Sequence, residues 1–459
     1  MSAADRNVAF LIAAVFAAVI GAILIADPSS LPVLVALPAV TLMAILVWGI
    51  LRGHRFSTLM HLFVAVFLMQ AVFRIRGYQD KDVDFQVILK IAVWATVAGV
   101  AALHARRWLE SMLTPFNLPC MLFLIWLFAT AMVSPNPTYT FVSAFTVFAC
   151  VIFCAYVFSM FEPLEVFTTI VLAIVAFCFI SIIVYFAIPE FGRYVYWLNE
   201  EKFVSGRLAG IAGSANNMAL IAAFALVVIG LYAREFHRMH WSFVPLATII
   251  CGAALVMTNS RTPLAMTLLI VFMTYVLTWR RLHIALLLIS LGLVAASILL
   301  PFSDEILLKV VSRSGGADEL TSLTGRTEIW YTVLKLVEQR PWTGYGYGSS
   351  VFVLPEYANS IGFATSHAHN LALQLLLTTG WTGLILFILT VAGVSARAIL
   401  HGDRVMFAML AFVLLNGVTE SSGFTTLANI CTLAFAIAVT LPSMGVQYAN
   451  HPAYQRRFS

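Results

Sequence analysis

The sequence predicts an all-α polytopic membrane protein, and three observations lead to this fold class. Hydrophobic residues make up 61% of the chain and charged residues only 10%, whereas an ordinary soluble domain is about 25% charged. Apolar runs long enough to cross a bilayer recur throughout the chain. Lys and Arg concentrate in alternate gaps between these runs, as they do when helices cross a membrane back and forth.

The apolar runs predict about 12–14 transmembrane helices. The first run is longer than a usual signal-peptide core and no small-x-small cleavage site follows it, so we expect it to be retained. The expected spans are residues 8–26, 31–51, 57–73, 85–104, 117–133, 138–159, 163–188, 216–233, 241–257, 263–279, 283–301, 381–399, 404–419 and 424–442.

The gaps richest in arginine are expected on the cytoplasmic side, which places the N-terminus there and the long polar loop outside. Four segments follow: N-terminal transmembrane helices over residues 1–204, an arginine-bearing membrane core over 205–301, the large loop over 302–380, and C-terminal transmembrane helices over 381–459. The cytoplasmic set is Arg6, Arg52, Arg55, Arg106, Arg107, Arg234, Arg238, Arg280, Arg281, Arg397, Arg404, Arg456 and Arg457.

The expected spans contain few ionisable groups, which argues against a transporter. His61 and Gln70 are the main exceptions, and we expect them to hydrogen-bond between helices. The six cysteines fall in spans and are expected to pack as small apolar residues. The net charge of +5 lies mostly in the cytoplasmic gaps, where the positive-inside rule explains it. No nucleic-acid partner is needed to explain this charge.

Two arginines precede spans at the expected outer edge of the membrane. Arg207 lies in "SGRLAGIAGSANNMA", which also contains the paired Asn216 and Asn217 that open a span, and Arg261 lies in the short gap "TNSRTP". Arginine binds phosphate oxygens in a bidentate manner and stays charged. These segments are therefore candidate phosphate contacts.

The outer loop is expected to contain an amphipathic helix that begins at a Thr324 cap and stops before Pro341. Arg326 would then lie at the helix N-terminus, where backbone N–H groups favour an anion. The apolar stripe of this helix is Ile329, Val333, Leu336 and Val337.

A second outer helix is expected from about His367 to Thr379, with Ser366 as its cap and a break at Gly380 before the next span. His367 and His369 would lie at its start, where the helix dipole keeps an imidazole neutral and able to accept a proton.

Two further segments and one further residue are candidate sites. "DKDVD", Asp80 to Asp84, lacks the glycine and glutamate of a calcium loop and is expected to be a solvated connector. "GYGYG" is expected to be a flexible turn whose Tyr345 and Tyr347 stack on a sugar. Glu420 is the acidic residue expected on the same face, where it would orient a histidine or an acceptor hydroxyl.

Three arginines and a neutral base suit the departure of a diphosphate and the activation of a hydroxyl. No Walker loop is present, and no ATP is expected outside the cytoplasm, so the donor must arrive activated. A lipid-linked diphosphate sugar meets both conditions.

Five segments between Ser205 and about Phe387 resemble, in order, the O-antigen ligase and polymerase family of bacterial membrane glycosyltransferases. They are "SGRLAGIAGSANNMA", "TNSRT", "LTGRTEIW", "RPWTGYGYG" and "HAHNLALQLLLTTGWTGLILF". The resemblance implies a metal-independent, cofactor-free, GT-C-like enzyme. It would transfer a glycan from undecaprenyl diphosphate at the periplasmic face of the bacterial inner membrane.

In that role His369 would be the base and Arg207, Arg261 and Arg326 would contact the diphosphate. The sequence has two asparagines after an alanine where many relatives have Pro-Asn or His-Lys-Asn. The implied substrate-binding residues are His367, Asn370, Asn216, Asn217, Tyr345, Tyr347 and Glu420.

The acceptor stays open within the family. The "HAHN" form resembles exopolysaccharide polymerases more closely, which favours polymerisation of exopolysaccharide or O-antigen repeat units. The alternative is a ligase that transfers the glycan to lipid A core, and no peptide-binding feature supports transfer to protein. Polysaccharide export machinery is a further candidate partner. A different and less favoured function is that of a transporter, such as a lipid-linked oligosaccharide flippase.

Overall fold

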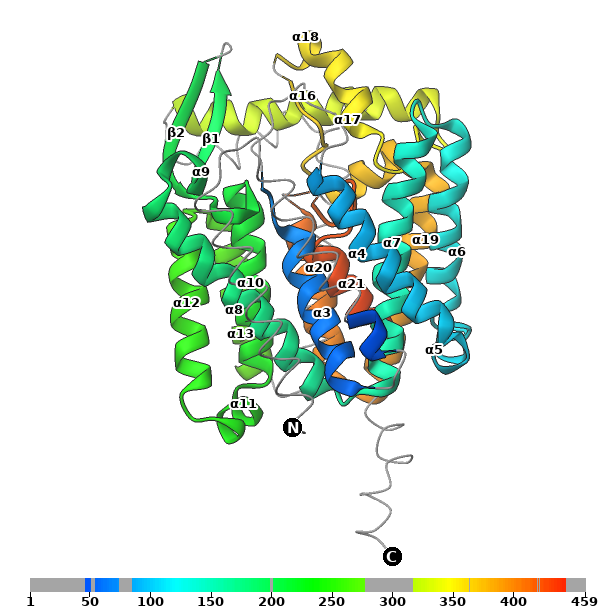
Figure 1. Ribbon diagram of the computed structural model, residues 1–459. Coiled ribbons are helices and arrows are strands. Elements are labelled where there is room, and N and C mark those ends of the chain that lie inside the picture. The colour runs from blue at the N-terminus through cyan, green and yellow to red at the C-terminus, as the bar shows by residue number, and fades with distance from the viewer. Residues whose placement is uncertain are drawn as a thin grey trace, which may run out of the picture. The chain divides into compact units, whose positions relative to one another are not determined.

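The computed structural model describes residues 46–50, 54–73, 85–198, 201–276, 317–362, 364–418, 420 and 422–442. Helices dominate this part of the chain (Figure 1). The chain divides into two compact units, and each is described by itself. Unit 1 comprises Met1–Ala105, Phe161–Ala225 and Arg234–Asn259, and unit 2 comprises Arg106–Met160, Leu226–Ala233 and Ser260–Ser459.

Unit 1 is built around α8, which packs against α3 and α12, while α4 packs on α3. Helix α10, Ala215–Leu231, begins in this unit and ends in unit 2. The other elements of unit 1 are α3 (Arg55–Gln70), α4 (Phe85–Leu103), α8 (Pro163–Ala187), α9 (Pro189–Gly192), β1 (Arg193–Leu198), β2 (Glu201–Leu208), η2 (Gly210–Ala212), α11 (Ala233–Met239) and α12 (Phe243–Met257).

Unit 2 contains a bundle in which α19 packs on α6 and α20, and α21 packs on α7 and α20. Helix α16 runs across one end of this bundle and contacts α19 (Figure 1). The elements are α5 (Ala105–Met112), α6 (Leu118–Ala129), η1 (Thr130–Val133), α7 (Pro137–Met160), α13 (Arg261–Val276), α16 (Ala317–Gln339), α17 (Ser350–Val353), η4 (Leu354–Tyr357), α18 (Ala358–Ile361), α19 (Leu371–His401), α20 (Arg404–Gly417), η5 (Ser422–Phe424) and α21 (Ile430–Thr440).

The predicted class, an all-α polytopic membrane protein, is confirmed. Within the described residues four helices are long and apolar enough to cross a membrane, and the bent pair α10 and α11 makes a fifth if it is one span. Every predicted span inside these residues coincides with a helix. The spans 8–26 and 283–301, most of 31–51, and the "DKDVD" segment lie outside the described residues, so the predicted total and the four-segment division stay predictions.

The predicted hydrogen bond between helices is confirmed for His61 but not for Gln70, whose buried amide nitrogen has no hydrogen-bond partner among the described residues. The Nε2 atom of His61 on α3 lies 3.3 Å from the hydroxyl of Thr96 on α4, which is the predicted bond between helices. All six cysteines are reduced and buried, as predicted for small packing residues.

A β-hairpin formed by β1 and β2 was not predicted. The strands pair antiparallel, with Val195 opposite Val204 and Leu198 opposite Glu201. The segment "RYVYWL" carries the aromatic and β-branched residues typical of strands, but it reads as a polar connector beside long apolar runs.

Two predicted helix starts were wrong. Helix α16 begins at Ala317, well before Thr324, so Arg326 lies inside the helix and not at its N-terminus. Helix α19 begins at Leu371 with Asn370 as its cap, so both histidines precede the helix. The predicted apolar stripe of α16 and its end at Gln339 are confirmed, since Ile329, Val333, Leu336 and Val337 are buried.

Helix α19 is broken at Gly380, as predicted. Gly380 has φ 67° and ψ −172°, and a Cβ there would lie 2.3 Å from the backbone carbonyl carbon of Trp342. The break leaves helix-end carbonyls without helical partners. Those of Leu377 and Thr378 accept from backbone N–H groups of the "GYGYG" segment, and that of Thr379 accepts from the indole of Trp126. The "GYGYG" segment is therefore a packed helix cap and not a flexible turn.

Arg397 on α19 was predicted to belong to the cytoplasmic set of arginines. In the structure it connects α19 to the end of α21 and to Asn117. It is buried and donates to the carbonyls of Ala438 and Val439 at 2.8 and 2.7 Å, and to the Asn117 side chain at 3.2 Å. The two carbonyls belong to the last turn of α21, where no helical N–H reaches them.

We expect Arg397→Met to lower the free energy of unfolding by about 2–3 kcal/mol, because buried acceptors lose a charged donor. Thermal unfolding in detergent measures the effect, with the exposed Arg404→Met as the matched control. Equal melting temperatures for the two variants would contradict the structural role.

Candidate active site

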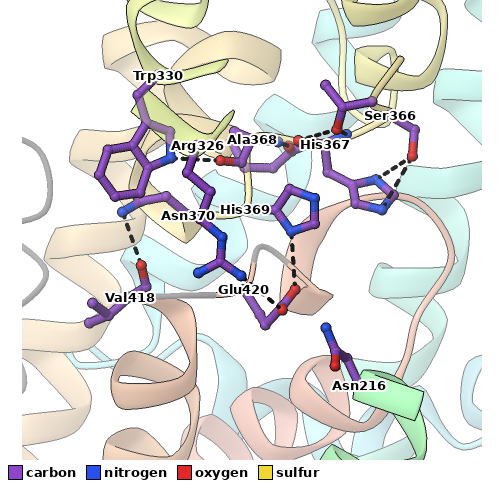
Figure 2. Close-up of polar contacts among 12 residues, drawn as sticks. Asn216, Arg326, Trp330, Ser366, His367, Ala368, His369, Asn370, Val418 and Glu420 are labelled. Atoms are coloured by element: carbon purple, nitrogen blue, oxygen red, sulfur yellow. Dashed lines mark hydrogen bonds and ion pairs between the residues drawn. The ribbon is translucent and has the colours of Figure 1, made fainter. Parts of the chain in front are cut away.

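The site in unit 2 begins with two residues one turn apart on α16. Arg326 and Trp330 stand at positions i and i+4, which share one face of a helix. Both are half-buried and point toward the loop that precedes α19 (Figure 2). The apolar stripe of α16 holds this face in place.

The loop before α19 is fixed by a cap and by a strained residue. The side chain of Asn370 is buried, accepts from the Leu373 N–H at 3.1 Å and donates to the Val418 carbonyl at 3.4 Å. His369, directly before it, has φ 49°, a left-handed conformation that costs a non-glycine residue free energy. The surrounding contacts must hold His369 there.

Ala368, between the two histidines, is held at both ends of its backbone. Its carbonyl accepts from the indole N–H of Trp330 at 2.9 Å, and its N–H donates to Gln374 Oε1 at 3.0 Å. Gln374 in turn donates to the Ser350 hydroxyl at 2.8 Å. These contacts tie the histidine loop to α16, α17 and α19.

Glu420 joins the arginine to the histidine, as Figure 2 shows. Its Oε1 lies 3.6 Å from an Arg326 nitrogen, and its Oε2 lies 3.3 Å from His369 Nδ1. The side chain of Glu420 is 13% exposed, against 29% for Arg326 and 28% for His369. The carboxylate is thus the inner member of the cluster, and the arginine and histidine are the accessible ones.

The carboxylate also fixes the tautomer of His369. An ionised carboxylate only accepts hydrogen bonds, so Nδ1 must carry the proton that faces Glu420. In the neutral ring Nε2 is then the acceptor. The arrangement gives a base whose lone pair points away from its orienting carboxylate.

Electrostatics keep Glu420 ionised and His367 neutral. Burial raises the pKa of the Glu420 carboxyl, but the hydrogen bond from His369 and the nearby charges of His369 and Arg326 outweigh it, so the pKa lies below its ordinary value. Burial, aided by His369, lowers the pKa of His367 to about 4. His367 also lies beside Ser366, whose hydroxyl is 2.9 Å from Nδ1.

Arg207 is fixed within unit 1. Its Nε donates to the Thr258 carbonyl at 2.8 Å, its NH2 group donates to Asn216 at 3.0 Å, and it lies over the Tyr194 ring. Asn217 is exposed in the first turn of α10. Arg261 is exposed at the start of α13 in unit 2, three residues after Thr258 in the chain.

Two predicted sugar contacts differ from expectation. Tyr347 is fully buried and offers no face to a sugar, and burial raises the pKa of its hydroxyl. Tyr345 is half-buried, with its hydroxyl 2.9 Å from Gln339 Oε1 and its ring beneath Arg340. The Tyr345 N–H caps the Leu377 carbonyl, and the Tyr347 N–H donates to the Thr130 hydroxyl at 3.0 Å.

Trp330 and Gln374 were missed by sequence reasoning. A signal was available, because each follows a predicted site residue, Arg326 or Asn370, by four positions on a helix. Among the described residues no group of three or more His, Cys, Asp or Glu side chains is placed to hold a metal ion.

We expect acid to weaken the contribution of His367 to stability between pH 6.5 and about 4. The folded imidazole stays neutral until its pKa of about 4, whereas the unfolded chain takes up the proton near 6.5. The melting-temperature advantage of wild type over His367→Gln should therefore shrink over this range, with the exposed His401→Gln as control. A pH-independent advantage would contradict this assignment.

Comparison with known proteins agrees with the resemblance in sequence. The family model described as O-antigen ligase matches residues 246–388, a range that includes Arg261, Arg326 and His369 but not Arg207 or Glu420. A general O-oligosaccharyltransferase from Acinetobacter baylyi is 30% identical over 207 residues, or 41% of this chain.

The match spans only 36% of that relative's length. The relative nonetheless transfers oligosaccharides by its name, as an O-antigen ligase does, and the matched family acts on lipid-linked glycan donors and acceptors in a membrane. Residues 246–388 thus match the O-antigen ligase family, and both comparisons support the resemblance of this chain to that family of bacterial membrane glycosyltransferases.

Proposed function

We propose that this protein transfers a glycan from undecaprenyl diphosphate to an acceptor sugar hydroxyl at the periplasmic face of the inner membrane. The observation that carries the proposal is the cluster in which Glu420 lies between Arg326 and His369. It combines a cation for a departing diphosphate with an oriented base for an attacking hydroxyl.

In the proposed step, His369 Nε2 accepts the proton of the acceptor hydroxyl while the oxygen attacks the anomeric carbon of the donor. The bond from that carbon to the diphosphate oxygen breaks, and undecaprenyl diphosphate leaves with the electron pair. Glu420 stabilises the imidazolium that forms, and Arg326 stabilises the charge on the leaving group.

Arg207 and Arg261 are proposed as further phosphate contacts. Arg207 donates to the carbonyl of Thr258, which lies three residues before Arg261 in the chain. The same short segment therefore binds Arg207 and contains Arg261. A guanidinium binds phosphate oxygens in a bidentate manner. A diphosphate has more oxygens than one guanidinium can bind, so several arginines suit it. That these two residues meet Arg326 at one diphosphate stays a prediction.

We propose polymerisation of exopolysaccharide or O-antigen repeat units as the reaction, on the resemblance of the "HAHN" segment. The description of the matched family, O-antigen ligase, favours the alternative of a ligase with lipid A core as acceptor, and protein is kept as a third acceptor for the test. All three share the donor and the chemistry at the anomeric carbon. A flippase gains no support from the buried His61 and Arg397, because each bonds to a neighbouring helix.

The test is glycan transfer by the purified protein in liposomes, with an undecaprenyl-diphosphate oligosaccharide and EDTA present. Separate arms add nothing, lipid A core or an unglycosylated periplasmic extract. Longer lipid-linked chains without core indicate a polymerase, product only with core a ligase, and product only on extract proteins a protein glycosyltransferase. Transfer in no arm, or transfer abolished by EDTA and restored by a metal, would contradict the proposal.

In the same assay we expect His369→Ala to lower kcat by about 10²- to 10⁴-fold, the usual contribution of a general base. Arg326→Ala should lower it by about 10²-fold or more through loss of leaving-group stabilisation. Lys335→Ala, an exposed cation on the same helix, is the control. Wild-type rates in both site variants would exclude this cluster as the catalytic centre.

We expect Glu420→Gln to lower kcat by about 10²-fold, with a smaller change in KM, because Glu420 positions the base without touching substrate. Loss of the neighbouring anion also destabilises the imidazolium, so the basic-form limb of the pH–rate profile should move to lower pH. Glu356→Gln, an exposed carboxylate of η4, is the control. A rate loss with an unmoved pH profile would assign Glu420 a purely structural role.

A further inference from the structure

A pocket lined by polar and apolar side chains lies at the other end of α16, away from Glu420. Its volume is about 560 Å³, and Ser134, Gln339, Arg340, Trp342 and Thr343 are among its lining residues. The catalytic proposal uses none of these side chains.

The indole of Trp342 is 63% exposed at this pocket, so its ring is accessible to a ligand. The lining combines the amide of Gln339 and the hydroxyls of Ser134 and Thr343 with the apolar side chains of Met132, Val133 and Pro341. A sugar ring complements such a lining. Its C–H face stacks on an aromatic ring, and its hydroxyls donate and accept hydrogen bonds.

Among the described residues that line the pocket, Arg340 is the one cation, and it is already engaged within the protein. It donates to the Val133 carbonyl at 2.8 Å and lies 4.7 Å from the centre of the Tyr345 ring. Its guanidinium therefore forms part of the wall, which suits a neutral sugar better than a phosphate.

The pocket is rigid in its backbone. The Pro341 carbonyl accepts from the Trp381 N–H at 2.7 Å, and the Gly344 N–H donates to the Arg340 carbonyl at 3.0 Å. Gly380 lies directly against the backbone of Trp342. A wall held in this way is ready for a ligand before it arrives, which limits the entropy lost on binding.

The pocket and the catalytic cluster are linked by α16. Thirteen residues separate Arg326 from Gln339, and at about 1.5 Å per residue this is roughly 20 Å along the helix. The first segment of α19 runs beside α16 over this length, from the Trp330–Ala368 contact to the Trp381–Pro341 contact. A chain of several sugars spans such a distance, whereas a single sugar does not.

We propose that the Trp342 pocket is a distal glycan subsite that holds the donor's saccharide chain several sugars away from the diphosphate. The assignment rests on the proposed function, but it does not depend on the acceptor, because polymerase, ligase and protein glycosyltransferase all use a donor with a long glycan. It replaces Tyr345 and Tyr347 as the sugar-stacking residues.

The first test is direct binding, which needs no transfer. Oligosaccharides of one and of several repeats, released from the lipid-linked glycan by mild acid, are added to the full chain in nanodiscs. Saturation-transfer NMR and calorimetry should give an affinity about tenfold weaker for Trp342→Ala than for wild type with the longer oligosaccharide. Trp342→Phe should restore most of it, and Trp241→Ala, an indole 71% exposed in unit 1, should bind as wild type does.

The second test is the dependence of transfer on donor length. In Trp342→Ala the KM for the donor should rise with the number of repeats, about tenfold for the longest, while kcat changes little. Binding lost in Trp342→Ala but no transfer by wild type would uphold the subsite and refute the proposed function. Transfer by wild type with equal glycan affinity in all variants would overturn the subsite and leave Trp342 as a membrane anchor.

Discussion

The break at Gly380 is the constraint on which the described part of unit 2 depends. Helix α19 can change direction there only because a residue without Cβ adopts positive φ directly against the backbone of Trp342. The segment before the break lies along α16 and brings the histidine loop to Arg326, and the segment after it packs in the bundle with α6 and α20. The carbonyls of Leu377 and Thr378 released by the break are bound by the "GYGYG" segment, which directly follows Trp342 and Thr343 of the pocket wall. One glycine thus helps to set the positions of both the Arg326–Glu420–His369 cluster and the Trp342 pocket.

Among the described residues, Glu420 is the one largely buried carboxylate that contacts both Arg326, the proposed phosphate contact, and His369, the proposed base. Glu420 occupies one end of the Arg326 guanidinium, which has more N–H donors than a single carboxylate oxygen accepts. The same carboxylate turns the acceptor nitrogen of His369 away from itself. Because His367 is kept neutral beside this pair, no second imidazolium competes for Glu420. The left-handed backbone of His369 is held by contacts to both of its neighbours, Ala368 and Asn370.

The sequence was most informative where a residue's role depends on local pattern. Apolar run lengths located the helices of the described residues, the stripe from Ile329 to Val337 predicted the buried face of α16, and Gly380 predicted the break. It was least informative at boundaries. Thr324 and Ser366 both had the chemistry of caps, but α16 already begins at Ala317, and the side chain of Asn370 caps α19. The hairpin was missed because long apolar helices surround its short strands.

By itself the sequence determined the fold class and supplied the family resemblance and the candidate site residues, because hydropathy and spacing are properties of the chain. It singled out Arg326, His369 and Glu420 separately, over almost a hundred residues of sequence. Only the tertiary structure decided that one carboxylate serves both other groups, and that Trp330 and Gln374 hold the loop between them. It also decided that Tyr347 is buried and Trp342 exposed. These outcomes depend on which side chains meet after helices far apart in sequence have packed, and local pattern does not carry that information.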